Sequence, residues 1–371
     1  MMRGWHNLKR KMAKVQLSED AIMKELDAYM KSVIEKGLDG KIRNVIEYHL
    51  GWRDLDFSEL EFGNIGKRGR PMMCILTSML FAPDYKYSFP VAAAIEFIHS
   101  FSLIYDDIQD RDTIRRGRPS VWSLWGEDEA INVGCVLQTM VYEAIADPKN
   151  VMSPAHLPWL IQSVNRTMWR VCNGQQLDLE LTKSRNHVTR TQYLEVITGK
   201  TAALFEAAAH LGAFCSNADE RQLALCRLFG ENVGLAFQIF DDVVGIWGSR
   251  EQGLDKPSLD LQHRKKTYPI IYAHENCQTD VDRQVIHRYY EKEDLNECDL
   301  MNMMELLNRC DSLSKSLEIG FQYLKIAMQA LDEIAGDEAI KARIRVWVNY
   351  VIDKQISTLQ GYTRRDNELV T

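Results

Sequence analysis

Apolar residues recur at helical spacing along most of the chain. Near the start they fall at Ile22, Leu26, Tyr29, Met30 and Val33, and near the end at Leu317, Phe321, Leu324, Met328 and Leu331. This spacing places them on one face of a helix. Ser18 and Gly37 are residue types that begin and end helices, so they bound the first helix. Because no run alternates as strands do and no short repeat is visible, the pattern predicts an all-α fold of about a dozen helices.

Three loop-like segments interrupt the helical pattern, at 112–121, 147–158 and 248–260. None of them is long enough to be a linker between domains. We therefore predict one helical domain at 17–355, preceded by a basic N-terminal arm at 1–16 and followed by a polar C-terminal tail at 356–371.

Composition narrows the class of protein. The chain has 371 residues, and because 46% of them are hydrophobic, the composition excludes a disordered chain. The net charge of −7 argues against nucleic-acid binding. Eight scattered cysteines predict reduced thiols in a cytoplasmic protein. No uninterrupted apolar run approaches the roughly 18 residues that span a bilayer, so we expect no transmembrane segment.

A first group of carboxylates ends an apolar stretch, EFIHSFSLIYDDIQD. Asp106 and Asp110 lie one helical turn apart on one face, and Asp107 flanks them. Like charges at this spacing destabilise a helix, and a bound cation would offset that cost. Oxygen ligands without nearby cysteine favour Mg²⁺ over Zn²⁺. A solvated acidic helix end is the simpler alternative, but the apolar residues before the group favour a site.

A second group follows the apolar stretch GENVGLAFQIF, where Asp241 and Asp242 come one turn after Gln238. Two adjacent aspartates alone are a weak signal. Two apolar helices that each end in aspartates are a stronger one, because such helices facing each other would line an apolar cavity with a carboxylate rim.

Basic side chains stand between and around these groups. They are Lys67, Arg68, Arg70, Arg115, Arg116, Lys200, Lys256, Arg264, Lys265 and Lys266. Mg²⁺ beside basic groups is what a diphosphate requires, although each basic run taken singly fits a solvated helix end. Neither GxxxxGK[ST] nor GxGxxG is present, so metal and side chains, not a glycine-rich loop, would hold the diphosphate.

Six motifs occur in a recognisable order: GKRGRP, EFIHSFSLIYDDIQDRDTIRRGRP, GQQLDLE, GKTAALFEAAAHLGA, FQIFDD and DKPSLDLQHRKKTYP. From about Gly66 to Pro269 the chain resembles the trans-type isoprenyl diphosphate synthases. The resemblance implies an isoprenoid synthase-type helical bundle, a homodimer, and a deep central hydrophobic pocket. It also implies that the pocket mouth is closed by the two aspartate motifs with three Mg²⁺ ions.

The same resemblance implies roles for single residues. Asp106, Asp110 and Asp241 would ligate Mg²⁺, with Asp107 and Asp242 in support. The diphosphate of isopentenyl diphosphate would be bound by Lys67, Arg70, His99 and Arg116. The allylic diphosphate would be bound by Arg115, Lys200, Lys256 and Lys265. Thr201 and Gln238 would lie close to the allylic carbocation.

Three positions depart from the family pattern. The third aspartate of the second motif is Gly245, the glycine before the last-motif lysine is Arg264, and an aspartate common in the helix after the first motif is Cys135. These changes leave the residues for ionisation in place, but the glycine at 245 would weaken one metal site of the second motif.

Residues just upstream of the first aspartate motif set the pocket floor in this family. Phe101 is bulky, Ser102 is small, and DDIQD lacks a two-residue insertion. This combination resembles geranylgeranyl diphosphate synthases, which predicts a C20 product with C15 and C25 as neighbours. The alternative is that Phe101 is ordinary core packing.

Two other functions remain open. A class I terpene cyclase of the same fold would ionise a prenyl diphosphate without isopentenyl diphosphate, and the incomplete second motif and many aromatics suit it. The retained Lys67, Arg70, His99 and Arg116 argue against it. A noncatalytic partner subunit is the second alternative, although such subunits lose their aspartate motifs.

Overall fold

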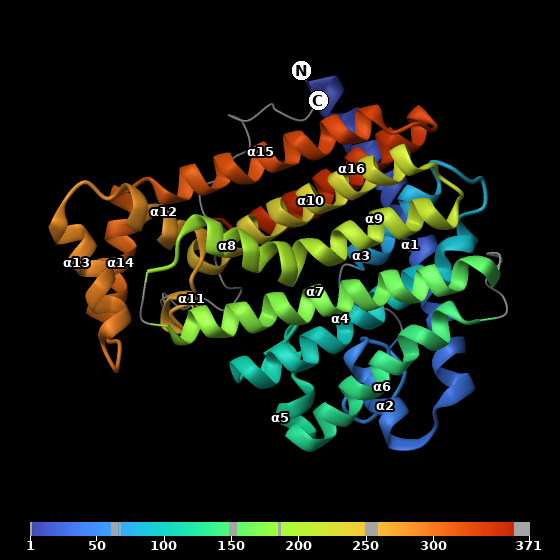
Figure 1. Ribbon diagram of the computed structural model, residues 1–371, viewed down its shortest axis with the longest axis horizontal. Coiled ribbons are helices and arrows are strands. Elements are labelled where there is room, and N and C mark those ends of the chain that lie inside the picture. The colour runs from blue at the N-terminus through green and yellow to red at the C-terminus, as the bar shows by residue number, and fades with distance from the viewer. Residues whose placement is uncertain are drawn as a thin grey trace. The chain divides into compact units, whose positions relative to one another are not determined.

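The computed structural model describes residues 2–60, 66, 68–147, 154–184, 187–248 and 259–359, with side chains in the first helix from Glu19 onward. In chain order the helices are α1 (Met2–Gly37), α2 (Gly40–His49), α3 (Gly69–Ser78), α4 (Phe89–Asp110), α5 (Val121–Trp125), α6 (Glu127–Ile145), α7 (Leu157–Lys183), α8 (Arg190–Ile197), α9 (Ala203–Cys215), α10 (Glu220–Trp247), α11 (Leu259–Gln262), α12 (Tyr268–Asn276), α13 (Asp280–Glu291), α14 (Glu297–Arg309), α15 (Ser312–Glu333) and α16 (Glu338–Ile356). Short 3₁₀ turns are η1 (Tyr85–Ser88) and η2 (Pro154–His156), and η3 (Thr198–Ala202) is a π-helical turn. The predicted all-α class is confirmed (Figure 1).

Both ends of the predicted domain differ from the sequence expectation in detail. The first helix ends at Gly37 as predicted, but it begins at Met2, so Ser18 lies inside a helix and not at its start. The helix therefore runs through the predicted arm at 1–16. At the other end α16 stops at Ile356 and Leu359 is buried, while residues 360–371 of the predicted tail lie outside the described residues.

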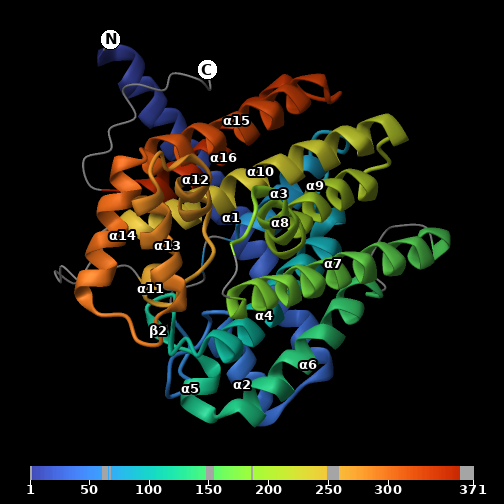
Figure 2. The ribbon, with the colours of Figure 1, turned by 60° about the vertical axis from the view of Figure 1, so that its left-hand side comes forward.

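The segment 112–121, predicted as a loop, contains a two-stranded antiparallel hairpin. Its strands are β1 (Ile114–Arg115) and β2 (Arg118–Pro119, labelled in Figure 2). The two connecting residues, Arg116 and Gly117, have φ of 54° and 73°. Positive φ at both central residues is the geometry that matches the twist of a two-residue hairpin. The hairpin is not predicted from the sequence because an arginine rarely adopts that backbone conformation.

The described chain divides into two compact units, each made of separate segments. Unit 1 comprises Met1–Trp169, Ala207–Arg227 and Ile334–Trp347. Within it α4 packs chiefly on α6 and α3 (Figure 1). A Cβ atom at Gly212 would lie 2.1 Å from the carbonyl oxygen of Cys74, so glycine is required where these two backbones meet. The prediction of one domain at 17–355 stays a prediction.

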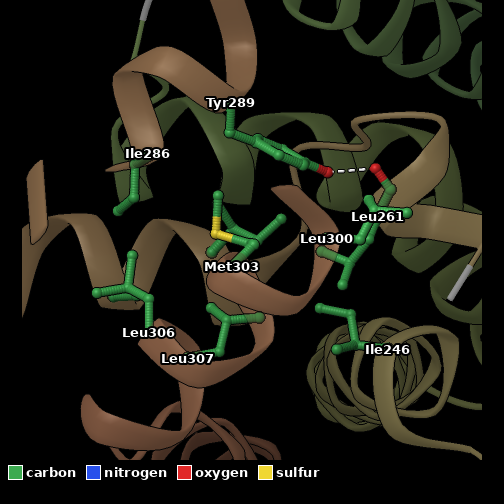
Figure 3. Close-up of a cluster of buried hydrophobic side chains, with 10 residues drawn as sticks. Ile246, Leu261, Ile286, Tyr289, Leu300, Met303, Leu306 and Leu307 are labelled. Atoms are coloured by element: carbon green, nitrogen blue, oxygen red, sulfur yellow. Dashed lines mark hydrogen bonds between the residues drawn. The ribbon is translucent and has the colours of Figure 1, made fainter. Parts of the chain in front are cut away.

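Unit 2 comprises Arg170–Glu206, Leu228–Glu333 and Val348–Thr371. Within it α12 packs on α15, and α13 pairs with α14 (Figures 1 and 2). Figure 3 shows a buried cluster in this unit, in which side chains from α13 and α14 lie beside Leu261 of α11 and Ile246 of α10. The Tyr289 hydroxyl donates a hydrogen bond to the Leu261 carbonyl oxygen, so α11 is fixed to the cluster by both packing and a hydrogen bond.

Among the described residues, two helices are long and apolar enough by length and composition to cross a membrane, although no transmembrane segment was expected from the sequence. They are Tyr85–Asp110 and Glu220–Trp247, and 78% and 61% of their apolar windows are buried inside the protein. A helix that is apolar on all sides and largely buried is typical of a protein core. All eight cysteines are free thiols.

Candidate functional site

The first aspartate motif occupies the last turn of α4. Asp106 and Asp110 are partly exposed on one face of the helix, while Asp107 is buried. The β1–β2 hairpin brings Arg115 onto this turn, where its guanidinium donates hydrogen bonds to Asp107 and lies 3.5 Å from Asp106 Oδ2. The motif is thus held by a cation from its own chain.

Asp107 is in an unusual electrostatic position. Burial raises the pKa of its carboxyl to about 6, against the opposing effect of the hydrogen bond from Arg115. Its second oxygen, Oδ2, is buried and has no hydrogen-bond partner among the described residues. A buried acceptor without a donor is costly, so this oxygen is available to a ligand.

Cationic and imidazole groups gather beside this turn within unit 1. Arg70 Nη1 lies 3.2 Å from His99 Nε2, and the Arg116 guanidinium packs on Gly66, where a Cβ would lie 2.8 Å from Cζ. Burial, together with Arg70 and Arg116, holds the pKa of His99 well below its usual range. Burial also lowers the pKa of Arg116. Two half-buried guanidinium groups beside an imidazole are suited to binding an anion.

One arginine of the GKRGRP motif has a different role. Arg68 is buried, and its guanidinium donates to Glu96 Oε1 at 2.5 Å and to the Leu50 carbonyl oxygen at 2.9 Å, and pairs with Asp27 Oδ1 at 3.2 Å. These contacts tie α1, α2 and α4 to the start of α3. Arg68 is therefore a structural residue and is not directed at a phosphate.

In unit 2 a backbone contact positions Lys200. A Cβ at Gly174 of α7 would lie 2.1 Å from the backbone nitrogen of Lys200, and one at Gly199 would lie 2.9 Å from Gly174 Cα. Only glycine permits this approach of α7 to the π-helical turn η3. The contact brings Lys200 Nζ within 2.6 Å of Asp178 Oδ2.

A chain of hydrogen bonds runs from η3 to the second aspartate motif. The Thr201 hydroxyl donates to Gln238 Oε1 at 2.6 Å, and Gln238 Nε2 donates to Asp242 Oδ1 at 2.9 Å. Asp242 Oδ2 accepts from the Tyr193 hydroxyl at 2.8 Å and from the Tyr268 backbone N–H at 2.9 Å. Burial raises the pKa of Asp242 to about 7. Both oxygens of Asp242 therefore accept hydrogen bonds from other residues of the protein.

Comparison with known proteins identifies the family. A profile described as polyprenyl synthetase matches residues 57–307, which is more than half of the chain. The chain belongs to the polyprenyl synthetase family. A short chain isoprenyl diphosphate synthase of Methanocaldococcus jannaschii is 32% identical over 273 residues, covering 73% of this chain and 77% of that protein.

The chain is also similar to two named prenyl diphosphate synthases. A (2E,6E)-farnesyl diphosphate synthase of Mycobacterium bovis is 35% identical over 237 residues, and this chain spans about 64% of that relative's length. The solved geranylgeranyl pyrophosphate synthetase of Pyrococcus horikoshii superposes with a TM-score of 0.79 at 28% identity, covering 94% of this chain and 99% of that one.

The structure describes some, but not all, of the site residues that the family resemblance implies. Lys67 and Lys256 lie outside the described residues. Arg70, His99, Arg115 and Arg116 lie together in unit 1, where Arg115 donates hydrogen bonds to Asp107 of the first motif. The predicted diphosphate-binding roles of these four residues stay predictions. Among the described residues, no three His, Cys, Asp or Glu side chains form a ready metal site. The ligand roles of Asp106, Asp110 and Asp241 stay predictions.

Two residues that lie close to the family motifs were not predicted from the sequence. His49 of α2 has a buried Nε2 without a hydrogen-bond partner in the described chain, and burial beside Arg116 and Arg115 lowers its pKa to about 3. Gln355 of α16 donates to Asp241 Oδ1 at 3.0 Å. No local signal marks either residue, since each is far from the motifs in sequence.

Two departures from the family pattern have physical explanations. Arg264 has φ of 54°, the left-handed conformation that a glycine adopts without strain, and its guanidinium donates to the carbonyl oxygens of Lys292 and Glu293. Cys135 Sγ lies 3.4 Å from the Tyr105 hydroxyl, whose ring packs on Gly134. Each of these two side chains therefore makes a contact with a neighbouring part of the chain.

Proposed function

We propose that this protein is a prenyltransferase that condenses an allylic diphosphate with isopentenyl diphosphate, giving chiefly the C20 product, geranylgeranyl diphosphate. The observation that carries the proposal is the half-buried group of Arg70, His99 and Arg116 beside the first aspartate motif. A terpene cyclase has no need of this anion site, because it adds no second diphosphate.

Mg²⁺ fits the residues that the chain provides. Asp106 and Asp110 offer oxygen ligands one helical turn apart, which suits a hard cation, and Asp107 Oδ2 is a buried acceptor without a hydrogen-bond partner in the described chain. Asp106, Asp110 and Asp241 would hold the ions, three by family resemblance. When bound, the ions neutralise the diphosphate and make it a better leaving group.

The chain's own side chains support the ionisation in three ways. Arg70 and Arg116 would bind the diphosphate of isopentenyl diphosphate, and Lys200, fixed by Asp178, would bind the allylic diphosphate. Thr201 and Gln238, which are hydrogen-bonded to each other, would present their oxygen atoms to the positive charge that develops on the allylic substrate. Asp242, with both oxygens engaged, would hold Gln238 in place.

The test is product analysis by mass spectrometry with Mg²⁺ and farnesyl diphosphate, with and without isopentenyl diphosphate. We expect geranylgeranyl diphosphate only when both substrates are present. A hydrocarbon or alcohol formed without isopentenyl diphosphate would favour the cyclase, and absence of any product would favour a noncatalytic partner subunit. We further propose a cytoplasmic homodimer, for which light scattering measures the mass.

Phe101 provides a prediction about product length. Its ring is buried on α4, five residues before Asp106, and lies 6.0 Å from the Tyr105 ring, while Ser102 is half-buried. Replacing Phe101 by Ala removes most of the side chain, so we expect longer products, with C25 exceeding C20. Leu103→Ala, on the same helix, is the matched control. An unchanged product distribution in Phe101→Ala would show that the ring is only core packing.

A further inference from the structure

One buried nitrogen beside the predicted diphosphate site of unit 1 has no use within the protein. It is Nε2 of His49, the last residue of α2, which has no hydrogen-bond partner among the described residues. Leaving a buried polar atom unpaired costs free energy, so each such atom calls for an explanation. His49 lies in none of the six family motifs, and the motifs therefore do not supply one.

Contacts of the two neighbouring residues fix the position of His49. The Tyr48 hydroxyl donates to the Pro119 carbonyl oxygen at 2.9 Å, which joins the end of α2 to the β1–β2 hairpin. The Leu50 carbonyl oxygen accepts from the Arg68 guanidinium at 2.9 Å, which joins the same end to the start of α3. The backbone at His49 is thus held to both elements that carry the cations of the predicted site.

The groups that act electrostatically on His49 come from the hairpin, from the start of α3 and from α4. They are Arg116, Arg115, Arg68 and His99. Burial is the main reason that the pKa of His49 falls to about 3, and the cations act in the same direction, against the Ser100 backbone. From α6, which packs on α2, Glu129 pairs with Lys41 at the opposite end of α2. The imidazole of His49 is therefore neutral in the free protein.

A diphosphate bound at Arg70 and Arg116 would reverse this balance. Its negative charge would offset the guanidinium groups and favour the charged form of an imidazole nearby. The C-terminus of α2 also favours a positive charge on His49. A protonated ring has a donor on each nitrogen, so Nε2 would then have an N–H for a phosphate oxygen to accept.

We propose that His49 is a further binding residue for the diphosphate of isopentenyl diphosphate, and that it takes up a proton from solvent as the diphosphate binds. The complex then holds one proton more than the free protein and ligand, and Nε2–H donates a hydrogen bond to a phosphate oxygen. This inference rests on the proposed function and deepens it.

The test is isothermal titration calorimetry of isopentenyl diphosphate with the full chain near neutral pH, without an allylic substrate, in two buffers of different ionisation enthalpy. The difference in heat between the buffers gives the number of protons taken up. We expect the unaltered protein to take up about one proton more than His49→Gln does, because glutamine donates a hydrogen bond but cannot be protonated. His49→Gln should bind about tenfold more weakly, since a neutral hydrogen bond replaces a charge-assisted one.

His156→Gln is the matched control. His156 lies in η2 of the same unit, where its ring centroid is 5.4 Å from that of Phe214. This variant should match the unaltered protein in affinity and in proton uptake. In steady-state kinetics, KM for isopentenyl diphosphate should rise about tenfold in His49→Gln with little change in kcat, and KM for the allylic substrate should stay the same.

Proton uptake separates binding by His49 from packing. Weaker binding with unchanged proton uptake would show that His49 only packs beside Arg116, and would overturn the inference, as would unchanged affinity and uptake in a folded His49→Gln. Circular dichroism melting checks the fold. Nitrogen NMR of histidine-labelled, unaltered protein tests the same point without a substitution, because the His49 signal should move to the imidazolium position when isopentenyl diphosphate is added. A signal that stays at the position of a neutral ring would also overturn the inference.

The same experiments distinguish this inference from the proposed function. Any of the contrary results for His49, obtained together with normal prenyl product, would leave the proposed function standing. Failure of the unaltered protein to bind isopentenyl diphosphate would contradict the proposed function and the inference with it.

Discussion

Asp106→Asn should lower kcat for prenyl transfer by about a hundred- to a thousand-fold, the range seen when one charge-stabilising group is removed. The asparagine keeps the shape of the side chain but loses the charge that a hard cation requires. The fold should be retained, because Arg115 makes its hydrogen bonds mainly to Asp107 and not to Asp106. The measurement is a steady-state rate at several Mg²⁺ concentrations, and part of the lost rate should return at high Mg²⁺.

The control for this prediction is Asp39→Asn. Asp39 is an exposed aspartate at the start of α2 that makes no side-chain capping bond, so its rate should equal that of the unaltered protein. A kcat for Asp106→Asn within about threefold of the control would contradict the ligand role of Asp106, since threefold corresponds to less than about 1 kcal/mol of barrier.

Arg68→Met should lower the free energy of unfolding by about 3–5 kcal/mol, the typical cost of removing one partner from a buried ion pair. Arg68 is fully enclosed between Asp27 and Glu96, and methionine fills similar space without charge. Two buried carboxylates would then remain without their cation. Burial already raises the pKa of Asp27 despite Arg68, so the loss should be smaller at acid pH, where a protonated Asp27 carboxyl needs no cation beside it.

Urea denaturation of the full chain measures this effect. Lys86→Met is the matched control, because Lys86 and Glu25 form an exposed pair at 3.0 Å that should contribute less than about 1 kcal/mol. If Arg68→Met is no less stable than Lys86→Met, the buried network does not hold these helices together. Adding Glu96→Met to Arg68→Met should recover part of the stability, because it removes one unpaired charge.

Helical periodicity was sufficient to predict the fold class, because the apolar spacing in α1 and α15 directly reflects which face is buried. It failed at the start of α1, where a capping residue type at position 18 lies inside a continuous helix. It failed again at the hairpin, where Arg116 and Gly117 adopt left-handed conformations that sequence propensity disfavours for arginine. At the hairpin, contacts with other segments outweigh local preference: the Tyr48 hydroxyl donates to the Pro119 carbonyl oxygen, and Arg116 packs on Gly66.

The motifs also predicted which types of side chain the site contains, but not what each one contacts. Arg68 and Arg70 stand two residues apart in one basic motif, yet one is enclosed between carboxylates and the other lies against His99. Arg115, predicted to bind the allylic diphosphate, also donates a hydrogen bond to Asp107, a contact that the motif does not reveal. His49 and Gln355 carry no motif at all, and only the packing of α2 and α16 brings them to the motif residues.

The sequence by itself determined the helical class, the family and the chemical types of the site residues, because periodicity and ordered motifs are properties of short segments. Only the tertiary structure decided that Asp242 is used internally and that His49 lies beside Arg116. The physical reason is that hydrogen-bond partners and excluded volume depend on which segments pack together. In this chain the hydrogen bond from Tyr48 to Pro119 holds the end of α2 to the hairpin, and so brings His49 beside Arg116.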